Sequence, residues 1–236
     1  MALHDEILTS TNDILSVPWN ERAGQVVPQT DDVVMKNGAV RVTATYLYAD
    51  MADSSGLAQS VADVVAARVM RSYVHMAVKV IRSRGGEIRS FDGDRVMGIF
   101  IGDAKNTNAV RAALGINYYV SQHLRASIKS TLPSTEKAGW TLHHGIGIDT
   151  GEALIVRGGA RDNSDLISVG SAPNAAAKLS DLRSQGPTFI SDGVFNHLRD
   201  DTKVHADGRE RFTYIGIENV GGKSISVYGS SWYWRP

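Results

Sequence analysis

The sequence contains no cysteine and only 6 prolines among its 236 residues. Without cysteine the chain has no disulfide, no thiolate metal ligand and no thiol nucleophile, which excludes zinc ribbons, iron–sulfur proteins and cysteine hydrolases. It also has no excess of charge, because 25 basic residues balance 25 acidic ones. A neutral chain lacks the electrostatic attraction that drives binding to nucleic acid or to an anionic membrane, so neither is expected as a partner.

Long hydrophobic runs are missing as well. No apolar stretch is long enough to span a bilayer, and the first residues lack the basic and then apolar pattern of a signal peptide. The composition, with 42% hydrophobic and 21% charged residues, is typical of an ordered globular protein. These features predict a soluble, cytoplasmic protein.

The chain divides into a short arm and one domain. Residues 1–38 contain turn signals and a helical stretch over 5–15, which predicts an N-terminal arm. Residues 39–236 are expected to form a single domain. Within it, residues 41–49 alternate as a strand does, and an apolar stripe at helical spacing runs over residues 57–80.

The next elements predict the fold class. Asp92-Gly93 lies between two apolar runs and predicts a hairpin, and a second helix is expected over residues 108–130. With the strand that follows, the order is β-α-β-β-α-β. This order is typical of the ferredoxin-like split βαβ fold, an α+β arrangement in which helices pack on one antiparallel sheet.

The remaining part of the chain predicts short strands and one helix. The strands are expected over residues 140–148, 152–156, 166–169, 188–190, 214–217 and 226–228, and the helix over 174–183. The polar and glycine residues at 149–151 predict a turn between the first two of these strands.

Two carboxylates stand at the ends of neighbouring strands. Asp50 ends the first strand and Asp94 follows the tip of the hairpin. In a split βαβ sheet both strand ends lie at one edge. Two carboxylates close together repel unless a cation lies between them, and their hard oxygen atoms suit Mg²⁺ or Mn²⁺ with a triphosphate. The alternative for either aspartate alone is ordinary turn chemistry.

Five segments resemble the motifs of the class III nucleotidyl cyclases, in the order and spacing of that family. They are residues 48–51 (YADM), 91–100 (FDGDRVMGIF), 145–152 (GIGIDTGE), 169–179 (VGSAPNAAAKL) and 221–228 (GGKSISVY). The resemblance covers about residues 40–230, and five motifs in sequence are specific where one would be weak.

The resemblance implies a cyclase homology domain with active sites between the two subunits of a homodimer. It implies that Asp50 and Asp94 bind two divalent cations, Mn²⁺ or Mg²⁺, and that the Met51 carbonyl adds a ligand. The 3′-hydroxyl of a nucleoside triphosphate then attacks the α-phosphate, and pyrophosphate leaves. Positioning and charge neutralisation supply most of the catalysis in such reactions.

Three further residues receive roles from the same resemblance. Asn174 of the other subunit orients the ribose, Lys178 stabilises the developing charge, and Lys223 reaches the triphosphate. Lys178 departs from the family pattern, which has arginine there. Lysine keeps the charge without the planar fork of arginine, so we expect reduced geometric control and not loss of activity.

Two other departures concern the base of the substrate. Ser90 stands where purine cyclases resemble each other in a lysine, and Ile167 stands where they carry aspartate or a small polar residue. A purine would lose hydrogen-bond partners at both positions, at about 1–3 kcal/mol for each lost bond. A purine is therefore expected to fit poorly.

Arg95 and Tyr48 offer replacement contacts to the base. A two-residue Asp92-Gly93 loop sets Arg95 opposite Ser90, from where it could donate to the carbonyl oxygens of a smaller base. Tyr48 shares a face with Asp50 and could stack on that base. The alternatives are a solvated charge for Arg95 and a core aromatic for Tyr48.

One subgroup is closer than the family at large. Residues 19–34 and 42–58 resemble the pyrimidine cyclases of bacterial anti-phage signalling, which implies cyclic UMP or cyclic CMP as a second messenger sensed by a paired effector. Uracil presents two carbonyl acceptors that suit arginine, so UTP is the expected substrate. A CTP cyclase, a purine (ATP or GTP) cyclase and a degenerate, inactive dimerisation or nucleotide-sensing module stay open as alternatives.

Overall fold

The computed structural model describes residues 3–160, 163–184, 186–220 and 222–236. One sheet dominates it, with the strand order β3-β4-β2-β5-β7-β9-β8, while β1 pairs with β2 and β6 with β5. The strands are β1 (Asn20–Ala23), β2 (Gly38–Ala52), β3 (Glu87–Asp92), β4 (Arg95–Phe100), β5 (His143–Ala160), β6 (Asn163–Val169), β7 (Thr188–Ser191), β8 (Thr213–Val220) and β9 (Lys223–Ser230).

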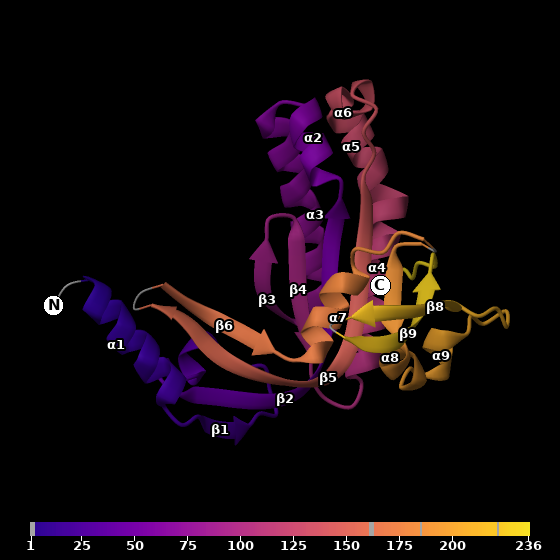
Figure 1. Ribbon diagram of the computed structural model, residues 1–236. Coiled ribbons are helices and arrows are strands. Elements are labelled where there is room, and N and C mark those ends of the chain that lie inside the picture. The colour runs from indigo at the N-terminus through magenta and orange to yellow at the C-terminus, as the bar shows by residue number, and fades with distance from the viewer. Residues whose placement is uncertain (1–2, 161–162, 185, 221) are drawn as a thin grey trace.

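Helices surround this sheet and connect its strands (Figure 1). They are α1 (Leu3–Ser16), η1 (Thr30–Asp32), α2 (Ser54–Ser60), α3 (Asp63–Ser83), α4 (Lys105–Tyr119), the π-helical turn η2 (Val120–Leu124), α5 (Arg125–Thr131), α6 (Pro133–Lys137), α7 (Ser171–Leu179), α8 (Asp192–Asn196) and α9 (Asp200–Lys203). None of the described helices is long and apolar enough to cross a membrane.

The expected split βαβ fold is confirmed. The elements β2, α3, β3, β4, α4 and β5 follow one another along the chain, and in the sheet they place β4 and β5 on either side of β2. All three of these strands are antiparallel to their neighbours in this group. The ends of β2 and of the β3–β4 hairpin therefore meet at one edge, as a site built on Asp50 and Asp94 requires.

The two faces of β2 have different environments because successive side chains point to opposite sides of a strand. Leu47, Ala49 and Met51 are buried in the larger core with residues of α3 and α4. Tyr46 lies on the other face, in a second core that also includes Ala176 of α7. A side chain at Gly147 would collide with the Ala176 carbonyl, so this glycine lets α7 lie close to the sheet.

The predicted turn at residues 149–151 is wrong, because β5 runs through it as one strand of 18 residues. Thr150 pairs with Thr45 of β2, and its hydroxyl lies 3.2 Å from the Ala44 carbonyl, to which it donates a hydrogen bond. Asp149 accepts a hydrogen bond from Ser191 of β7. These polar residues are satisfied inside the sheet by neighbouring strands, which a local sequence pattern does not reveal.

The helix expected over residues 57–80 is interrupted. It consists of α2 and α3, separated at Val61 and Ala62, which both have extended backbone angles. The helix expected over residues 108–130 is likewise divided into α4, η2 and α5. The apolar stripe continues across both interruptions, which is why the periodicity alone predicted uninterrupted helices.

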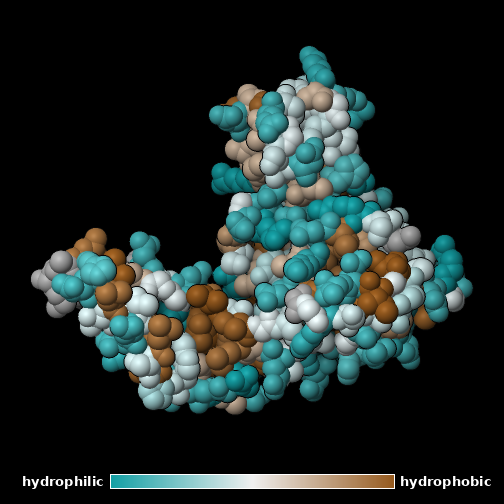
Figure 2. Space-filling model, viewed as in Figure 1, coloured by the Kyte–Doolittle hydropathy of each residue, from teal (hydrophilic) through white to brown (hydrophobic). Residues whose placement is uncertain are grey.

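The N-terminal segment lies along a long extension of the sheet. The distal part of β2 pairs with β5, β5 continues into a hairpin with β6, and β1 adds a parallel partner to β2. Figure 2 shows hydrophobic residues gathered over the β5–β6 part of this extension, and Ile167 and Val169 of β6 are about half exposed, at 52% and 56%. The boundary between residues 38 and 39 stays a prediction.

Candidate active site

Two aspartates meet at the edge formed by β2 and the hairpin. Asp50 lies near the end of β2, directly beside Gly145 of β5 in the strand register. Asp94 lies in the turn between β3 and β4. Burial raises the pKa of Asp50, two arginines oppose this effect, and the negative charge of Asp94 raises the pKa further. The two carboxylates are therefore close enough to repel each other.

Asp94 carries the clearest sign that this edge of the sheet suits a cation. Its Oδ2 atom is buried and has no hydrogen-bond partner among the described residues. A buried carboxylate oxygen without a partner is costly, and a divalent cation is the partner that hard oxygen ligands prefer. Within the described part of the chain no group of three or more acidic or histidine side chains could hold a metal, so a cation here would rest on this pair and other oxygen atoms.

Asp50 is held by two arginines. Arg95 Nε lies 3.3 Å from Asp50 Oδ1, and Arg95 Nη2 lies 3.4 Å from Oδ2. Arg183 Nη2 lies 3.6 Å from the same Oδ2 atom. The Asp50 side chain is only 15% exposed, so these contacts stabilise a charge that water largely cannot reach.

The hairpin register differs from the prediction. Asp92 pairs with Arg95, Phe91 with Val96 and Ser90 with Met97, so the two-residue loop is Gly93-Asp94. Gly93 has a φ of 61°, which glycine adopts without strain, and it can therefore occupy the first loop position. The predicted placement of Arg95 opposite Ser90 is wrong.

Arg95 still faces the site, because β4 places it on the same side of the sheet as Asp50. It also bonds to Asp181, with Nη2 and Oδ1 2.8 Å apart. Its Nε and Nη2 atoms are thus engaged, whereas Nη1 makes no hydrogen bond to the part of the chain that the structure describes. One nitrogen of the fork remains able to contact a ligand.

The other two residues expected to read the base lie along the same strands. Tyr48 is half-buried, and burial raises the pKa of its hydroxyl while the neighbouring charge of Arg95 lowers it. Tyr48 and Ser90 both pair with Met97 of β4, from opposite sides. The structure therefore brings Tyr48, Ser90 and Arg95 together, next to Asp50.

A second group of expected site residues is exposed. Asn174 and Lys178 lie one turn apart on the outer face of α7, whose inner face buries Ala172, Ala176 and Leu179. Lys223 begins β9 and is exposed as well. Among the described residues no hydrogen bond or ion pair joins these three side chains to Asp50 or Asp94.

Ile167 and Met51 complete the expected set. Ile167 is an exposed residue of β6, opposite Val156 of β5, and lies apart from the aspartate pair in the strand register. The Met51 side chain is buried in the larger core, so only its backbone carbonyl could be a metal ligand.

Arg183 is a site residue that the sequence did not reveal. Its guanidinium lies over Gly145, where a side chain would collide with Arg183 Nη1 and with the Ser180 carbonyl. The same Nη1 atom donates to the carbonyls of Ser180 and Leu182. The absence of a side chain at position 145 is the only trace of this contact in the sequence, and it depends on the fold.

Tyr73 of α3 is near enough to both aspartates for their charges to act on its hydroxyl. It is fully buried, and its hydroxyl has no hydrogen-bond partner among the described residues. Burial raises its pKa well above the usual value, and the charges of Asp50 and Asp94 add to this effect. Tyr73 belongs to the apolar stripe predicted over residues 57–80, and its ring is buried, but the stripe does not reveal the unpartnered hydroxyl.

Together these groups would suit a cation on one side of the sheet, while the side chains of Asn174, Lys178 and Lys223 make no hydrogen bond or ion pair within the described part of the chain. Three curated proteins resemble the chain over its whole length, and each is named uridylate cyclase. The protein from Rhodovulum sp. (strain MB263) is 41% identical over 100% of this chain and 98% of its own length. Those from Xanthomonas perforans and Burkholderia cepacia are 34% and 32% identical, and both matches cover 99% of the relative.

Solved structures give a consistent picture of the fold. A bacterial light-regulated adenylyl cyclase superposes with a TM-score of 0.70 at 23% identity, over 85% of this chain and 55% of that one. The guanylyl cyclase Cya2 superposes with a TM-score of 0.67 at 20% identity, over 83% of this chain and 95% of that one. The expected class III cyclase fold is thereby confirmed. No protein-family model matches the sequence.

Proposed function

The chain belongs to the uridylate cyclase family, and on that premise we propose that it converts UTP to 3′,5′-cyclic UMP and pyrophosphate. The observation that carries this proposal is the 41% identity to a uridylate cyclase over the whole chain. The buried, unpartnered Oδ2 atom of Asp94 supports it independently, because an inactive descendant would not need such an atom.

The reaction joins the 3′-oxygen of the ribose to the α-phosphorus. The bond from that phosphorus to the oxygen bridging the α- and β-phosphates breaks, and pyrophosphate leaves with the electron pair. The 3′-hydroxyl releases its proton to solvent water. A divalent cation, when bound, makes this hydroxyl more acidic and neutralises charge on the phosphates.

Asp50 and Asp94 would hold two such ions, Mn²⁺ or Mg²⁺, with the Met51 carbonyl as a further ligand. The repulsion between the two carboxylates and the orphaned Asp94 oxygen favour this assignment. Arg95 and Arg183 neutralise Asp50 in the absence of a cation, so both must release it when the cation binds.

Asn174, Lys178 and Lys223 would act on a nucleotide held by the partner subunit. They are exposed on α7 and β9, away from the carboxylates of their own protomer, as residues that complete a site across an interface would be. Asn174 would orient the ribose, while Lys178 and Lys223 would neutralise phosphate charge.

Arg95 and Tyr48 would read the base. Nη1 of Arg95 can donate to a uracil carbonyl, and the half-buried ring of Tyr48 offers a surface for stacking. Ser90 and Ile167 supply none of the groups that a purine requires. CTP remains the second candidate substrate, since it keeps one of the two carbonyl oxygens of uracil.

The proposal extends to the role of the product. Cyclic UMP would act in the cytoplasm as a second messenger of anti-phage defence and would be sensed by a separate effector protein. The support is the likeness of residues 19–34 and 42–58 to the pyrimidine cyclases of that kind of signalling.

The test is an incubation of the protein with each of the four ribonucleoside triphosphates and Mn²⁺, followed by chromatography of the products. Cyclic UMP from UTP, in excess over every other cyclic nucleotide, is the expected result. A product formed only from ATP or GTP would overturn the pyrimidine assignment, and the absence of any product would overturn the enzymatic one.

A further inference from the structure

A cavity of about 600 Å³ lies beside the candidate active site. It is bounded by the region where α4 passes through η2 into α5, by the start of β5, by the segment before β7 and by the C-terminal residues. The polar side chains that line it include Asn117, Arg125, His143, His144 and Arg183. Arg183 also touches Asp50, so one side chain connects the cavity with the candidate metal site.

The lining has charge of one sign. Two arginines face the cavity, and no carboxylate lines it among the residues that the structure describes. The whole chain is neutral, with 25 basic and 25 acidic residues, so this concentration of positive charge is local. Such a cavity attracts anions and repels cations.

His144 provides a second and independent sign of a ligand. It is only 3% exposed, it lines the cavity, and neither ring nitrogen has a hydrogen-bond partner among the described residues. Buried polar atoms are normally satisfied. A ligand or water in the cavity is the partner that this ring lacks.

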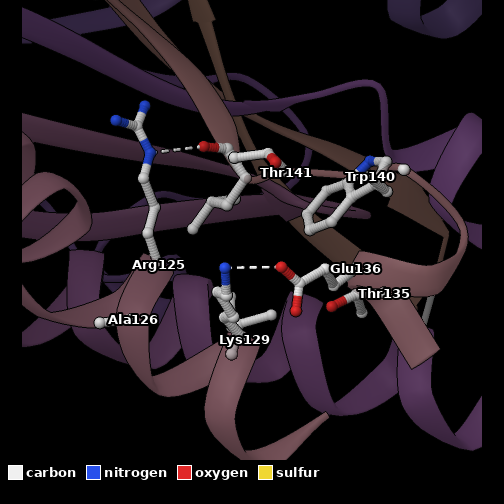
Figure 3. Close-up of a pocket in the computed structure, with 10 residues that line it drawn as sticks. Arg125, Ala126, Lys129, Thr135, Glu136, Trp140 and Thr141 are labelled. Atoms are coloured by element: carbon white, nitrogen blue, oxygen red, sulfur yellow. Dashed lines mark hydrogen bonds and ion pairs between the residues drawn. The ribbon is translucent and has the colours of Figure 1, made fainter. Parts of the chain in front are cut away.

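Arg125 is held in place but not saturated. Its Nε atom donates to the Leu142 carbonyl at 2.8 Å, while its two terminal nitrogens make no bond within the described part of the chain. Figure 3 shows its guanidinium pointing away from Lys129 and Glu136, which pair with each other in an adjacent pocket. Arg125 can therefore offer both terminal nitrogens to an oxyanion.

We propose that this cavity binds an oxyanion of the phosphate class through Arg125, Arg183 and His144. Inorganic phosphate and pyrophosphate share the oxygen geometry that a guanidinium recognises. An anion here competes with Asp50 for Arg183, so its binding loosens one of the two ion pairs that occupy the metal-binding carboxylate. If pyrophosphate is the natural ligand of this cavity, that identification rests on the proposed function, because pyrophosphate is a product of the cyclase reaction.

The experiment measures anion binding without nucleotide and without metal. Full-length protein in buffer containing a chelator is titrated calorimetrically with inorganic phosphate and, separately, with pyrophosphate. Saturable binding of either anion is expected, and the tighter one identifies the source. Because no turnover is measured, the result stands apart from the outcome of the cyclase assay.

Matched variants locate the site. Arg125→Gln should weaken binding about tenfold, the usual effect of removing a charge-assisted contact. Lys129→Gln removes the same charge one helical turn away and should leave the affinity unchanged. Equal losses in Arg125→Gln and Lys129→Gln, or no saturable binding by the unaltered protein, would overturn the proposal.

A variant with the opposite expected sign guards against misfolding. Asp50→Asn removes the negative charge that holds Arg183, so the affinity for the anion should rise about threefold or more. A misfolded protein would lose affinity instead. An unchanged or reduced affinity in correctly folded Asp50→Asn would contradict the competition for Arg183.

Discussion

The two groups of candidate site residues differ in how much of their environment one protomer provides. Asp50, Asp94, Arg95 and Tyr48 lie together at the β2–hairpin edge and are partly buried, and ion pairs join Asp50 to Arg95. Asn174, Lys178 and Lys223 are exposed on α7 and β9, without a hydrogen bond or ion pair from their side chains in the described part of the chain. The fold of one protomer places the first four residues side by side, and we call them the assembled group. It leaves the other three exposed on the surface, and we call them the presented group.

This difference has a physical explanation in the strength of the charges involved. Two carboxylates beside each other need fixed partners when no cation is bound, and Arg95 and Arg183 supply them to Asp50. A lysine or an asparagine on a helix surface needs only water. Under the proposed function, a site divided in this way would be stable in the separate protomer and would become complete only when a second protomer supplied the exposed group.

The largest expected effect is on the assembled group. Asp94→Asn should lower kcat for cyclic UMP formation at least about a thousandfold, because the cation loses a charged ligand. Its affinity for Mn²⁺, measured by calorimetry, should fall as well, while sedimentation should still detect the same oligomer. Asp92→Asn removes an equal charge from the same hairpin and serves as the control, and comparable losses in both variants would contradict the metal assignment.

A smaller effect is expected on the presented group. Lys178→Gln should lower kcat about a hundredfold, because the negative charge that develops on the phosphate oxygens in the transition state loses the positively charged lysine side chain. Lys178→Arg keeps that charge and adds a planar fork, so its rate should equal or exceed that of the unaltered protein. Steady-state kinetics with UTP distinguish the two variants. If Gln and Arg behave alike, charge at this position is irrelevant to the reaction.

The effect of removing Arg95 on the choice between UTP and CTP should be smaller than the effect of Lys178→Gln on kcat. Arg95→Ala should reduce the preference for UTP over CTP about tenfold, as expected for one lost hydrogen bond to a carbonyl. The ratio of kcat/KM for the two substrates is the measurement. Arg82→Ala on the outer face of α3 is the control, and an unchanged ratio in Arg95→Ala would assign this arginine to Asp50 alone.

The last prediction concerns stability and not turnover, and it rests on His144, a buried residue near the assembled group. Burial, with help from nearby positive charges, lowers the pKa of His144 to about 3. Below about pH 6.5 the imidazole of His144 is therefore protonated in the unfolded chain but stays neutral in the folded chain. The free energy of unfolding consequently falls as the pH drops from about 6.5 towards 3. At pH 4.5 the neutral, buried His144 should lower the free energy of unfolding by about 2–3 kcal/mol relative to its value above pH 6.5.

His144→Gln removes this titration and should flatten the acid limb of the stability curve in urea unfolding between pH 6.5 and 4.5. His143→Gln, at the exposed neighbouring position, should leave that limb unchanged. Identical curves for the unaltered protein and His144→Gln would show that His144 is protonated in the folded state.

The sequence predicted which residues form the assembled group, but it did not predict the hairpin register that positions them. Asp50 and Asp94 could be located because strand alternation and the Asp-Gly signal place them at neighbouring strand ends. The exact register could not, because either Asp92-Gly93 or Gly93-Asp94 satisfies a two-residue loop, and only the strand pairing in the structure shows that the second one forms. As a result, the strand partner of Arg95 is Asp92 and not Ser90 as predicted.

Long-range contacts set the limit of prediction elsewhere. The continuity of β5 depends on bonds from Thr150 and Asp149 to two other strands. The position of Arg183 depends on the space over Gly145, from which it is separated in the chain by the rest of β5, by β6 and by α7. Neither is a property of a local window, so hydrophobic periodicity reported the α+β fold correctly and missed both.

The central claim is that one active site needs the carboxylates of one protomer and the α7 residues of another. Asp94→Asn and Asn174→Ala, each inactive alone, should regain about a quarter of the unaltered activity when they are co-expressed with different tags, because half of the dimers are mixed and each has one intact site. Purified mixed dimers that remain as inactive as either parent would contradict the claim.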